Sequence, residues 1–249
     1  MKLEEKLKEK FLNTKSKNIF KYIYYFFQKI RKDKYVKTSY SGGAVDLIVE
    51  HYFKDKKKGI YIDIGAYHPF NGSNTYKLFL KGWSGINIDL DPQTIDSFNY
   101  FRPKDENICA AVSEAISEKN LYFHHNRSAI NTLVEKMGHR AKEIRKIKTT
   151  TINKILEDSK FKGLNIDFLS IDVEGHELDV IKGLDFQKYS PKIIVIEHQD
   201  PMMKKVEFHN QNIERTIQYD IYKYMISKNY VLINWLHSDL VFINKKFQD

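Results

Sequence analysis

Four apolar segments of this 249-residue chain each lead into an acidic residue: Asp63, Asp89, Asp172 or Glu197. A carboxylate can take up a proton, accept hydrogen bonds from hydroxyl groups or bind a metal ion. If the segments are strands of one parallel sheet, their carboxyl ends share an edge, and open α/β sheets bind ligands at that edge. The four acidic residues are therefore expected to lie at one site.

The first two acidic residues have the surroundings of a ribose-binding site. Asp63 is followed by Gly65 and Ala66, small residues that let a ligand approach the backbone, and a following helix would offer free N–H groups. Asp89 comes 24 residues after Gly65, where an acidic residue can accept hydrogen bonds from both hydroxyls of a ribose. This spacing predicts a ligand that contains a ribose.

The other two acidic residues have histidines close behind them. Glu174 and His176 come just after Asp172, and His198 follows Glu197. Taken singly, each has a structural explanation, because Asp172 could cap the next helix and Glu174 would suit the helix dipole. Acidic residues at four strand ends, two of them near a histidine, are poorly explained by solvation alone. Their joint placement favours a functional site.

An alternation of strand and helix patterns supplies the sheet that must hold these residues. Near-continuous apolar runs predict strands at residues 59–66, 84–92, 106–113, 166–175 and 191–200, and smaller ones at 120–123 and 146–151. Helical patterns cover residues 74–81, 151–158, 177–183 and 210–228. Two further strands, expected to pair antiparallel, close the chain at 230–236 and 239–245. The alternation predicts an α/β fold with a mostly parallel sheet and helices on both faces.

The composition is that of a folded protein. Its 42% hydrophobic and 29% charged residues exclude a fibrous or largely disordered chain. The lone Cys109 excludes a disulfide framework and a cysteine-cluster zinc site, and it suits a reducing compartment. No apolar run reaches the ~18 residues of a membrane span, and the charged first residues do not resemble a signal peptide. A cytoplasmic location is therefore expected.

Positive charge is concentrated at the start of the chain. Residues 1–40 hold 12 Lys/Arg and 4 Asp/Glu, whereas residues 41–249 hold 29 and 28. The larger part is nearly neutral, so no specific nucleic-acid binding is expected. Ser41-Gly42-Gly43 marks the expected boundary between a basic, aromatic-rich arm (1–40) and one larger domain (41–249).

Within the arm, residues 18–34 have the pattern of an amphipathic helix. Its apolar face comprises Ile19, Phe20, Ile23, Phe26, Phe27 and Ile30. One interpretation is a helix packed on the larger domain or on a second subunit of a homo-oligomer. The other is a helix on an anionic membrane surface, because lysines mixed with tyrosines and phenylalanines suit that interface. The sequence leaves both open.

Several segments resemble the FkbM family of S-adenosylmethionine-dependent methyltransferases, namely residues 63–92, 148–156, 166–183 and 194–198. The most specific part is Asp-Val-Glu-Gly-His-Glu at 172–177. The resemblance spans roughly residues 41–245. It implies a Rossmann-like class I methyltransferase fold with a seven-stranded sheet, and methyl transfer to oxygen, often on a sugar.

Three departures from the family pattern stand out. Residues 67–70 read Tyr-His-Pro-Phe where Asn and a second Gly are more frequent, and Gly72-Ser73-Asn74-Thr75 then opens the helix. Asn153 stands where Asp is frequent. Asp89-Leu90-Asp91 replaces a turn of the Glu-Pro-Asn type, although the acid is kept.

The resemblance assigns roles to residues that already stood out. It implies that Asp63 faces the ammonium of S-adenosyl-L-methionine, that Asp89 holds the ribose and that residues 111–113 line the adenine. The residues predicted to bind the cofactor are Asp63, Gly65, Ala66, Tyr67, Ser73, Asn74, Asp89, Leu90, Ala111, Val112 and Asp172.

Methyl transfer to a sugar hydroxyl needs help with the hydroxyl proton. His176 and His198 have suitable ordinary pKa values for a general base. Alternatively, Asp172, Glu197 and His198 offer carboxylate oxygens and one imidazole, a set that suits Mg²⁺ or Mn²⁺ better than zinc. The candidate catalytic residues are His176, His198, Asp172, Glu174 and Glu197.

A polar segment, residues 114–147, cannot be ordered from its pattern. If it folds over the site, Arg127 is placed to recognise a phosphate or carboxylate of the acceptor.

Three other functions are weighed against a sugar or glycan-precursor O-methyltransferase. A metal-dependent glycosyltransferase could use Asp89-Leu90-Asp91 as an Asp-x-Asp motif, but Asp63 and the 172–176 segment would then be idle. A nicotinamide-dependent oxidoreductase wants G-x-G-x-x-G after the first strand, and residues 65–70 hold one of those glycines. A non-enzymatic scaffold would not explain acids at four strand ends.

Overall fold

The computed structural model describes residues 21–22, 25–27, 29, 36–198 and 211–248. The chain separates into two compact units, Met1–Thr38 and Ser39–Asp249. The described residues of the first unit between 21 and 29 are helical, but the rest of the predicted 18–34 helix, with Ile19, Phe20, Ile23 and Ile30, lies outside the described residues. Among the described residues, no helix is long and apolar enough to span a membrane.

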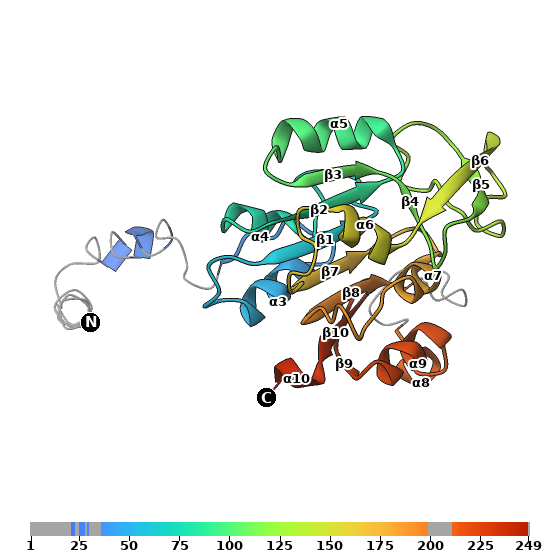
Figure 1. The fold of residues 1–249 in the computed structure, drawn as a ribbon. Helices are drawn as coiled ribbons and strands as arrows, with labels where there is room; N and C mark the ends of the chain where they lie inside the picture. The colour runs from blue at the N-terminus through green and yellow to red at the C-terminus, as the bar shows by residue number, and fades with distance from the viewer. Residues whose placement is uncertain (1–20, 23–24, 28, 30–35, 199–210, 249) are drawn as a thin grey trace. The chain divides into compact units, whose positions relative to one another are not determined.

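The second unit is built on a seven-stranded sheet in the order β3-β2-β1-β7-β8-β10-β9 (Figure 1). Its strands are β1 (Ile60–Ile64), β2 (Ser84–Asp89), β3 (Glu106–Cys109), β7 (Phe168–Ile171), β8 (Ile193–Glu197), β9 (Tyr230–Leu236) and β10 (Asp239–Asn244). β10 pairs antiparallel with β8 and β9, and the other pairs are parallel. The predicted α/β fold, with its mostly parallel sheet and antiparallel closing strand, is confirmed.

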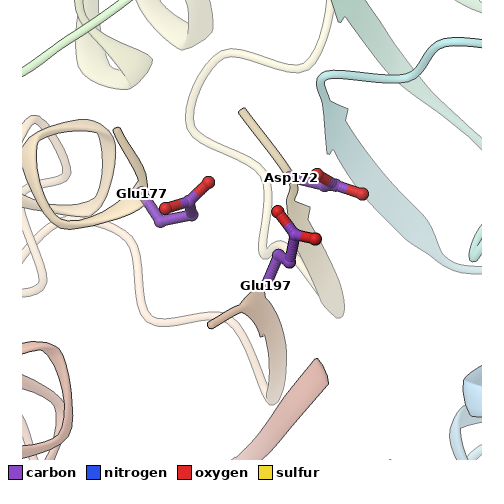
Figure 2. Close-up of side chains that lie close together, drawn as sticks. All are labelled: Asp172, Glu177 and Glu197. Atoms are coloured by element: carbon purple, nitrogen blue, oxygen red, sulfur yellow. The ribbon is translucent and has the colours of Figure 1, made fainter. Parts of the chain in front are cut away.

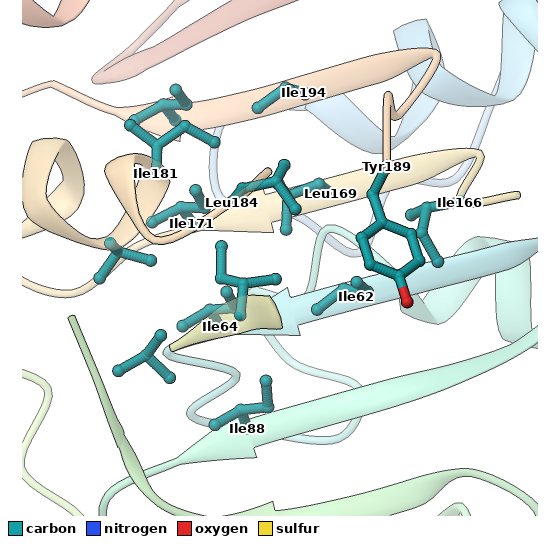
Figure 3. Packing of buried hydrophobic residues seen from close by; sticks show 14 of the residues in the cluster. Ile62, Ile64, Ile88, Ile166, Leu169, Ile171, Ile181, Leu184, Tyr189 and Ile194 are labelled. Carbon is teal, nitrogen blue, oxygen red and sulfur yellow. The ribbon is translucent and has the colours of Figure 1, made fainter. Parts of the chain in front are cut away.

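Alternate residues of the central strands bury their side chains on opposite faces of the sheet. On β1, Ile62 and Ile64 join one apolar cluster and Tyr61 the other. Figure 3 shows the first cluster, where Ile62 and Ile64 lie near Leu169 and Ile171 of β7. This cluster includes residues of α6 (Ile152–Asp158), α7 (Glu177–Lys182) and α9 (Asp220–Ser227), and the second includes residues of α3 (Val45–Tyr52) and α4 (Tyr76–Leu80). Helices therefore cover both faces, as predicted.

The predicted strand at 106–113 is two strands that belong to different sheets. β3 stops at Cys109, whose partner Asp89 is the last residue of β2. With no further β2 residue to pair with, the chain continues as β4 (Ala111–Val112), which pairs with β6 (Glu143–Thr150). β5 (Glu118–Phe123) completes this smaller sheet, in the order β4-β6-β5.

The predicted long helix at 210–228 is also wrong in its described part. Two short helices replace it, α8 (Ile213–Thr216) and α9, because Tyr219 is extended between them, with φ −71° and ψ 145°. The helix α5 (Pro92–Phe101) was not predicted, although Asp91 caps it and Pro92 begins it. α3 was also not predicted, and a short α10 (Lys245–Gln248) ends the described chain.

Candidate active site

One pocket opens at the carboxyl ends of β1, β2 and β7, and its walls include every residue predicted to bind the cofactor. Its floor depends on Gly65. The Gly65 backbone has φ +77°, and a Cβ built there would lie 1.6 Å from the carbonyl oxygen of Asp172. A side chain at residue 65 would therefore push the loops after β1 and β7 apart.

Asp63 is buried at the inner end of this pocket, with 5% of its surface exposed. The hydroxyl of Thr75 donates to its carboxylate at 2.6 Å. Burial raises the pKa of Asp63, while Thr75 and the positive charge of Arg102 oppose that rise. Asp63 is therefore a carboxylate held in a low-polarity setting by specific partners, as a group facing a ligand cation would need to be.

Arg102 organises the loop after β1 from within the protein, where it is fully buried. Its guanidinium donates to the Pro69 carbonyl at 2.8 Å, to the Ser73 hydroxyl at 2.9 Å and to the Thr75 hydroxyl at 2.8 Å. The planar fork of an arginine can serve several acceptors in fixed directions. Arg102 thus connects the shape of the pocket loop to the hydroxyl that holds Asp63.

Asp89 projects from the end of β2 into the same pocket. One carboxylate oxygen accepts the Tyr67 N–H at 3.0 Å and the other accepts the Asp91 N–H at 2.8 Å. Burial raises the pKa of Asp89 to about 6, against the effect of these backbone hydrogen bonds. The two N–H groups fix the carboxylate, and each oxygen retains a lone pair for a ligand hydroxyl.

Asp91 has a structural task. Its side chain accepts the Gln93 N–H at 2.8 Å as the N-cap of α5, and its other oxygen accepts the Arg127 N–H. Both carboxylate oxygens therefore bind backbone groups. This use of Asp91 argues against an Asp-x-Asp metal site at residues 89–91.

The polar segment that the sequence could not order forms β5, β6 and a loop over the pocket. Residues of this loop line the pocket: Arg127, Ser128, Ala129, Asn131 and Leu133. One anchor is the Asp91–Arg127 hydrogen bond, and another is the Thr132 hydroxyl, which donates to the Glu174 carbonyl at 2.7 Å. The loop thus joins the end of β2 to the end of β7.

A cluster of carboxylates lies at the β7 and β8 side of the site. One carboxylate oxygen from each of Asp172, Glu177 and Glu197 lies within 4.8 Å of the other two (Figure 2). Glu177 is buried, and one of its oxygens accepts the N–H groups of Val173 at 3.1 Å and Gly175 at 2.9 Å.

Burial and the nearby charge of Glu197 make Asp172 and Glu177 weaker acids than usual. Asp172 is open to the pocket yet surrounded by protein, and these surroundings together with Glu197 raise its pKa well above the usual range. Burial, with a contribution from Glu197, raises the pKa of Glu177 to about 7. Burial, and next the nearby charge of Glu197, also raise the pKa of Asp239 to about 7. Near neutral pH Glu177 and Asp239 can therefore take up or release a proton.

Comparison with known families decides the class of protein. The model of the methyltransferase FkbM domain matches residues 63–231, more than half of the chain. The chain belongs to the FkbM methyltransferase family. It is therefore an enzyme, and the family implies S-adenosylmethionine as the methyl donor. No curated protein matches the chain.

The pocket of this FkbM methyltransferase suits that donor. Asp89 offers two fixed oxygens to ribose hydroxyls, and the buried carboxylate of Asp63 suits an ammonium. Leu90, Ala111 and Val112 add an apolar wall of the kind an adenine ring needs. These individual contacts stay predictions.

His176 is less available as a base than its position suggested. It lines the pocket, but its Nε2 lies 3.0 Å from the Ser113 hydroxyl and its Nδ1 lies 3.3 Å from an Asp179 oxygen. Burial lowers its pKa, although Asp179 opposes this. Both ring nitrogens face protein groups, which favours a positioning role.

His198 and Glu174 occupy different places. His198 is buried at the end of β8, where its ring centroid lies 4.8 Å from that of Tyr219. The compact cluster groups Asp172 and Glu197 with Glu177 rather than with His198. Glu174 lines the pocket in a left-handed turn, with φ +56°.

Two residues that help to form the site were not among the predicted site residues. Glu177 ends the 172–177 segment, and its acidic type was a usable signal that it joins the carboxylates. Arg102 gave no such signal, because its acceptors are a carbonyl and hydroxyls scattered along a loop some thirty residues earlier in the chain.

Proposed function

We propose that this FkbM methyltransferase methylates a hydroxyl group of a sugar or glycan precursor, using S-adenosylmethionine. The observation that carries the proposal is the Asp172–Glu197 carboxylate pair, which stands beside the predicted donor-binding residues. The donor supplies an electrophilic methyl group on a sulfonium sulfur. The protein must hold an acceptor oxygen in line with that group and take its proton.

Asp172 is the favoured base. Its raised pKa brings the carboxylate closer to the basicity that efficient proton abstraction requires, and Glu197 can share the proton that it takes up. His198 at the end of β8 stays an alternative base, and His176 would orient the site.

The sugar class rests on the resemblance to the FkbM family. Support from the pocket is limited to its chemistry. Hydrogen-bonding side chains line the pocket together with Asp172, and Tyr67, at 45% exposure, adds an aromatic residue to the wall. An aromatic ring with a polar tip suits a ligand with both polar and apolar faces.

A radiolabelled-methyl assay tests the proposal. The purified full chain is incubated with labelled S-adenosylmethionine and free, nucleotide-linked or lipid-linked sugars, and the product is identified by mass spectrometry. The proposal predicts O-methylation of at least one sugar by the wild type and almost none by Asp172→Asn. Methylation confined to nitrogen or sulfur acceptors would contradict it.

A divalent cation is a second candidate for activating the hydroxyl. The cluster of Asp172, Glu177 and Glu197 offers three carboxylates, a donor set that suits Mg²⁺ or Mn²⁺. Calorimetric titration of Mn²⁺ into wild type and Glu177→Gln distinguishes the routes. Binding that the substitution weakens supports the metal route, whereas no binding by wild type leaves the carboxylate base.

The arm is proposed to make a peripheral contact with an anionic membrane or a second subunit, with the enzyme acting in the cytoplasm. Phe26 and Phe27 of this unit are exposed. Co-sedimentation of the full chain with anionic and neutral vesicles, followed by sizing in solution, separates the two contacts.

A further inference from the structure

The pocket has a strongly one-sided charge. Its lining includes five carboxylates, those of Asp63, Asp89, Asp91, Asp172 and Glu174. Within the part of the chain that the structure describes, Arg127 is the one lysine or arginine that lines it. An isolated guanidinium in such a pocket is the natural partner of a ligand anion.

The backbone of Arg127 is held in an unfavourable conformation. Its φ is +55°, in the left-handed region that costs a non-glycine residue energy. The carboxylate of Asp91 stabilises this conformation by accepting the Arg127 N–H. Asp91 is itself fixed as the cap of α5, so the strained residue is anchored to the rigid end of β2.

The rest of the loop is braced as well. The Asn131 carboxamide accepts the His124 N–H at 2.8 Å and donates to the His125 carbonyl at 3.0 Å. Thr132 ties the far end to the Glu174 carbonyl at 2.7 Å. Arg127 is thus presented over the pocket by a loop with an internal brace and an anchor at each end.

The guanidinium of Arg127 is available for a ligand. Among the described residues it forms no hydrogen bond or salt bridge, and the side chain is exposed. Burial of His68 is the first cause of its lowered pKa, and the positive charge of Arg127 is the second. The Arg127 charge therefore lies near the loop that follows β1, which contains His68. That loop is where Gly65 and Ala66 would meet the amino-acid portion of the donor.

We propose that Arg127 forms an anion subsite in the roof of the pocket, which binds a carboxylate or phosphate group. The inference rests on the proposed function, because it concerns ligands of the same pocket. Two sources share this chemistry: the carboxylate of the methyl donor, and an acidic group of the acceptor such as a sugar phosphate or uronate. Either one would pair with a guanidinium in a two-pronged hydrogen bond.

Calorimetry with two donor analogues tests the first source. S-adenosylhomocysteine carries the amino-acid carboxylate, and 5′-methylthioadenosine lacks it. If Arg127 binds that carboxylate, Arg127→Gln weakens S-adenosylhomocysteine binding roughly 10- to 100-fold and leaves methylthioadenosine binding unchanged. Arg127→Lys should recover part of the loss. Arg140→Gln, an exposed arginine near the same loop that does not line the pocket, is the matched control.

Inorganic phosphate tests the second source. It is titrated into wild type and Arg127→Gln, each both unliganded and saturated with S-adenosylhomocysteine. Phosphate binding by the saturated wild type that Arg127→Gln abolishes assigns the subsite to the acceptor.

The proposal is overturned if Arg127→Gln changes neither S-adenosylhomocysteine affinity nor phosphate binding. Failure of the proposed function looks different, because wild type would then not bind S-adenosylhomocysteine at all. The unliganded phosphate titration still decides the subsite in that case.

Discussion

The carboxylates on the two sides of the active site differ in what surrounds them. On the β1 and β2 side, Asp63 is held by Thr75 and Asp89 by two backbone N–H groups. On the β7 and β8 side, Asp172 faces Glu197 and Glu177. The first arrangement holds charged hydrogen-bond acceptors in place for a ligand. The second brings like charges close together, which favours binding of a proton or a cation. We propose that donor binding and catalysis are divided between these two halves of one sheet edge.

The two halves meet at Gly65, where the largest effect is expected. Gly65→Ala would place a methyl group 1.6 Å from the Asp172 carbonyl oxygen at a positive φ. We expect it to destabilise the domain by more than about 4 kcal/mol or to prevent folding.

Gly163→Ala is the control, because its φ of +73° is similar and nothing lies within 4 Å of the added Cβ. It should cost only about 1–2 kcal/mol. If urea denaturation shows equal losses of unfolding free energy for Gly65→Ala and Gly163→Ala, the close contact at Gly65 does not hold the two halves together.

The next largest effect concerns the buried cation of the binding half. Arg102→Met removes the donor to Pro69, Ser73 and Thr75 and leaves Asp63 without its nearby positive charge. We expect unfolding free energy to fall by about 3–5 kcal/mol. Arg102→Lys should recover part of it, and Arg140→Met, at an exposed site, should change little. A loss below about 1 kcal/mol for Arg102→Met would show that the loop does not depend on this residue.

Paired substitutions test the division of labour itself. Asp172→Asn should lower kcat by about 10²-fold or more, while its loss of S-adenosylhomocysteine affinity should be smaller than that of Asp89→Asn. Asp89→Asn should show the reverse, with weaker binding and a nearly normal kcat at saturating donor. Steady-state kinetics and calorimetry on both variants are compared. If Asp172→Asn mainly loses affinity, the two halves are not separate in function.

A smaller effect is expected from pH. The pKa of Asp89 is raised to about 6, so its carboxylate is ionised at pH 7.5 and becomes protonated below pH 6. Protonation removes a charged acceptor of the ribose hydroxyls, so affinity for S-adenosylhomocysteine should fall as pH drops through about 6, by up to about tenfold per pH unit. Asp89→Asn should bind more weakly at pH 7.5 and show a flatter profile. An identical slope in the two proteins would assign the titration to another group.

Much of the binding half could be predicted from the sequence because its signals are local. Apolar runs located β1 and β2, and the residues at their carboxyl ends, Gly65 and Asp89, line the pocket as expected. The fold followed from the same alternation of strands and helices. Arg102 could not be found this way, since its partners are brought to it only by tertiary structure.

The β7 and β8 side of the site was harder to predict from the sequence for a similar reason. Both ring nitrogens of His176 lie near partners from separate elements, Ser113 beyond β4 and Asp179 on α7, and no spacing in the sequence reveals that. The single strand expected at 106–113 failed because strand length depends on where the neighbouring β2 ends. The break before α9 likewise reflects the extended backbone of Tyr219 rather than a helix-breaking residue.

The most direct test of the account is calorimetric titration of S-adenosylhomocysteine into wild type, Asp89→Ala and Asp96→Ala. Asp96 is an exposed residue of α5 outside the pocket and serves as the control. We predict binding in the micromolar range for wild type and Asp96→Ala, weakened by roughly 1–3 kcal/mol in Asp89→Ala. A folded wild-type protein that does not bind S-adenosylhomocysteine would contradict the assignment of this pocket to the methyl donor.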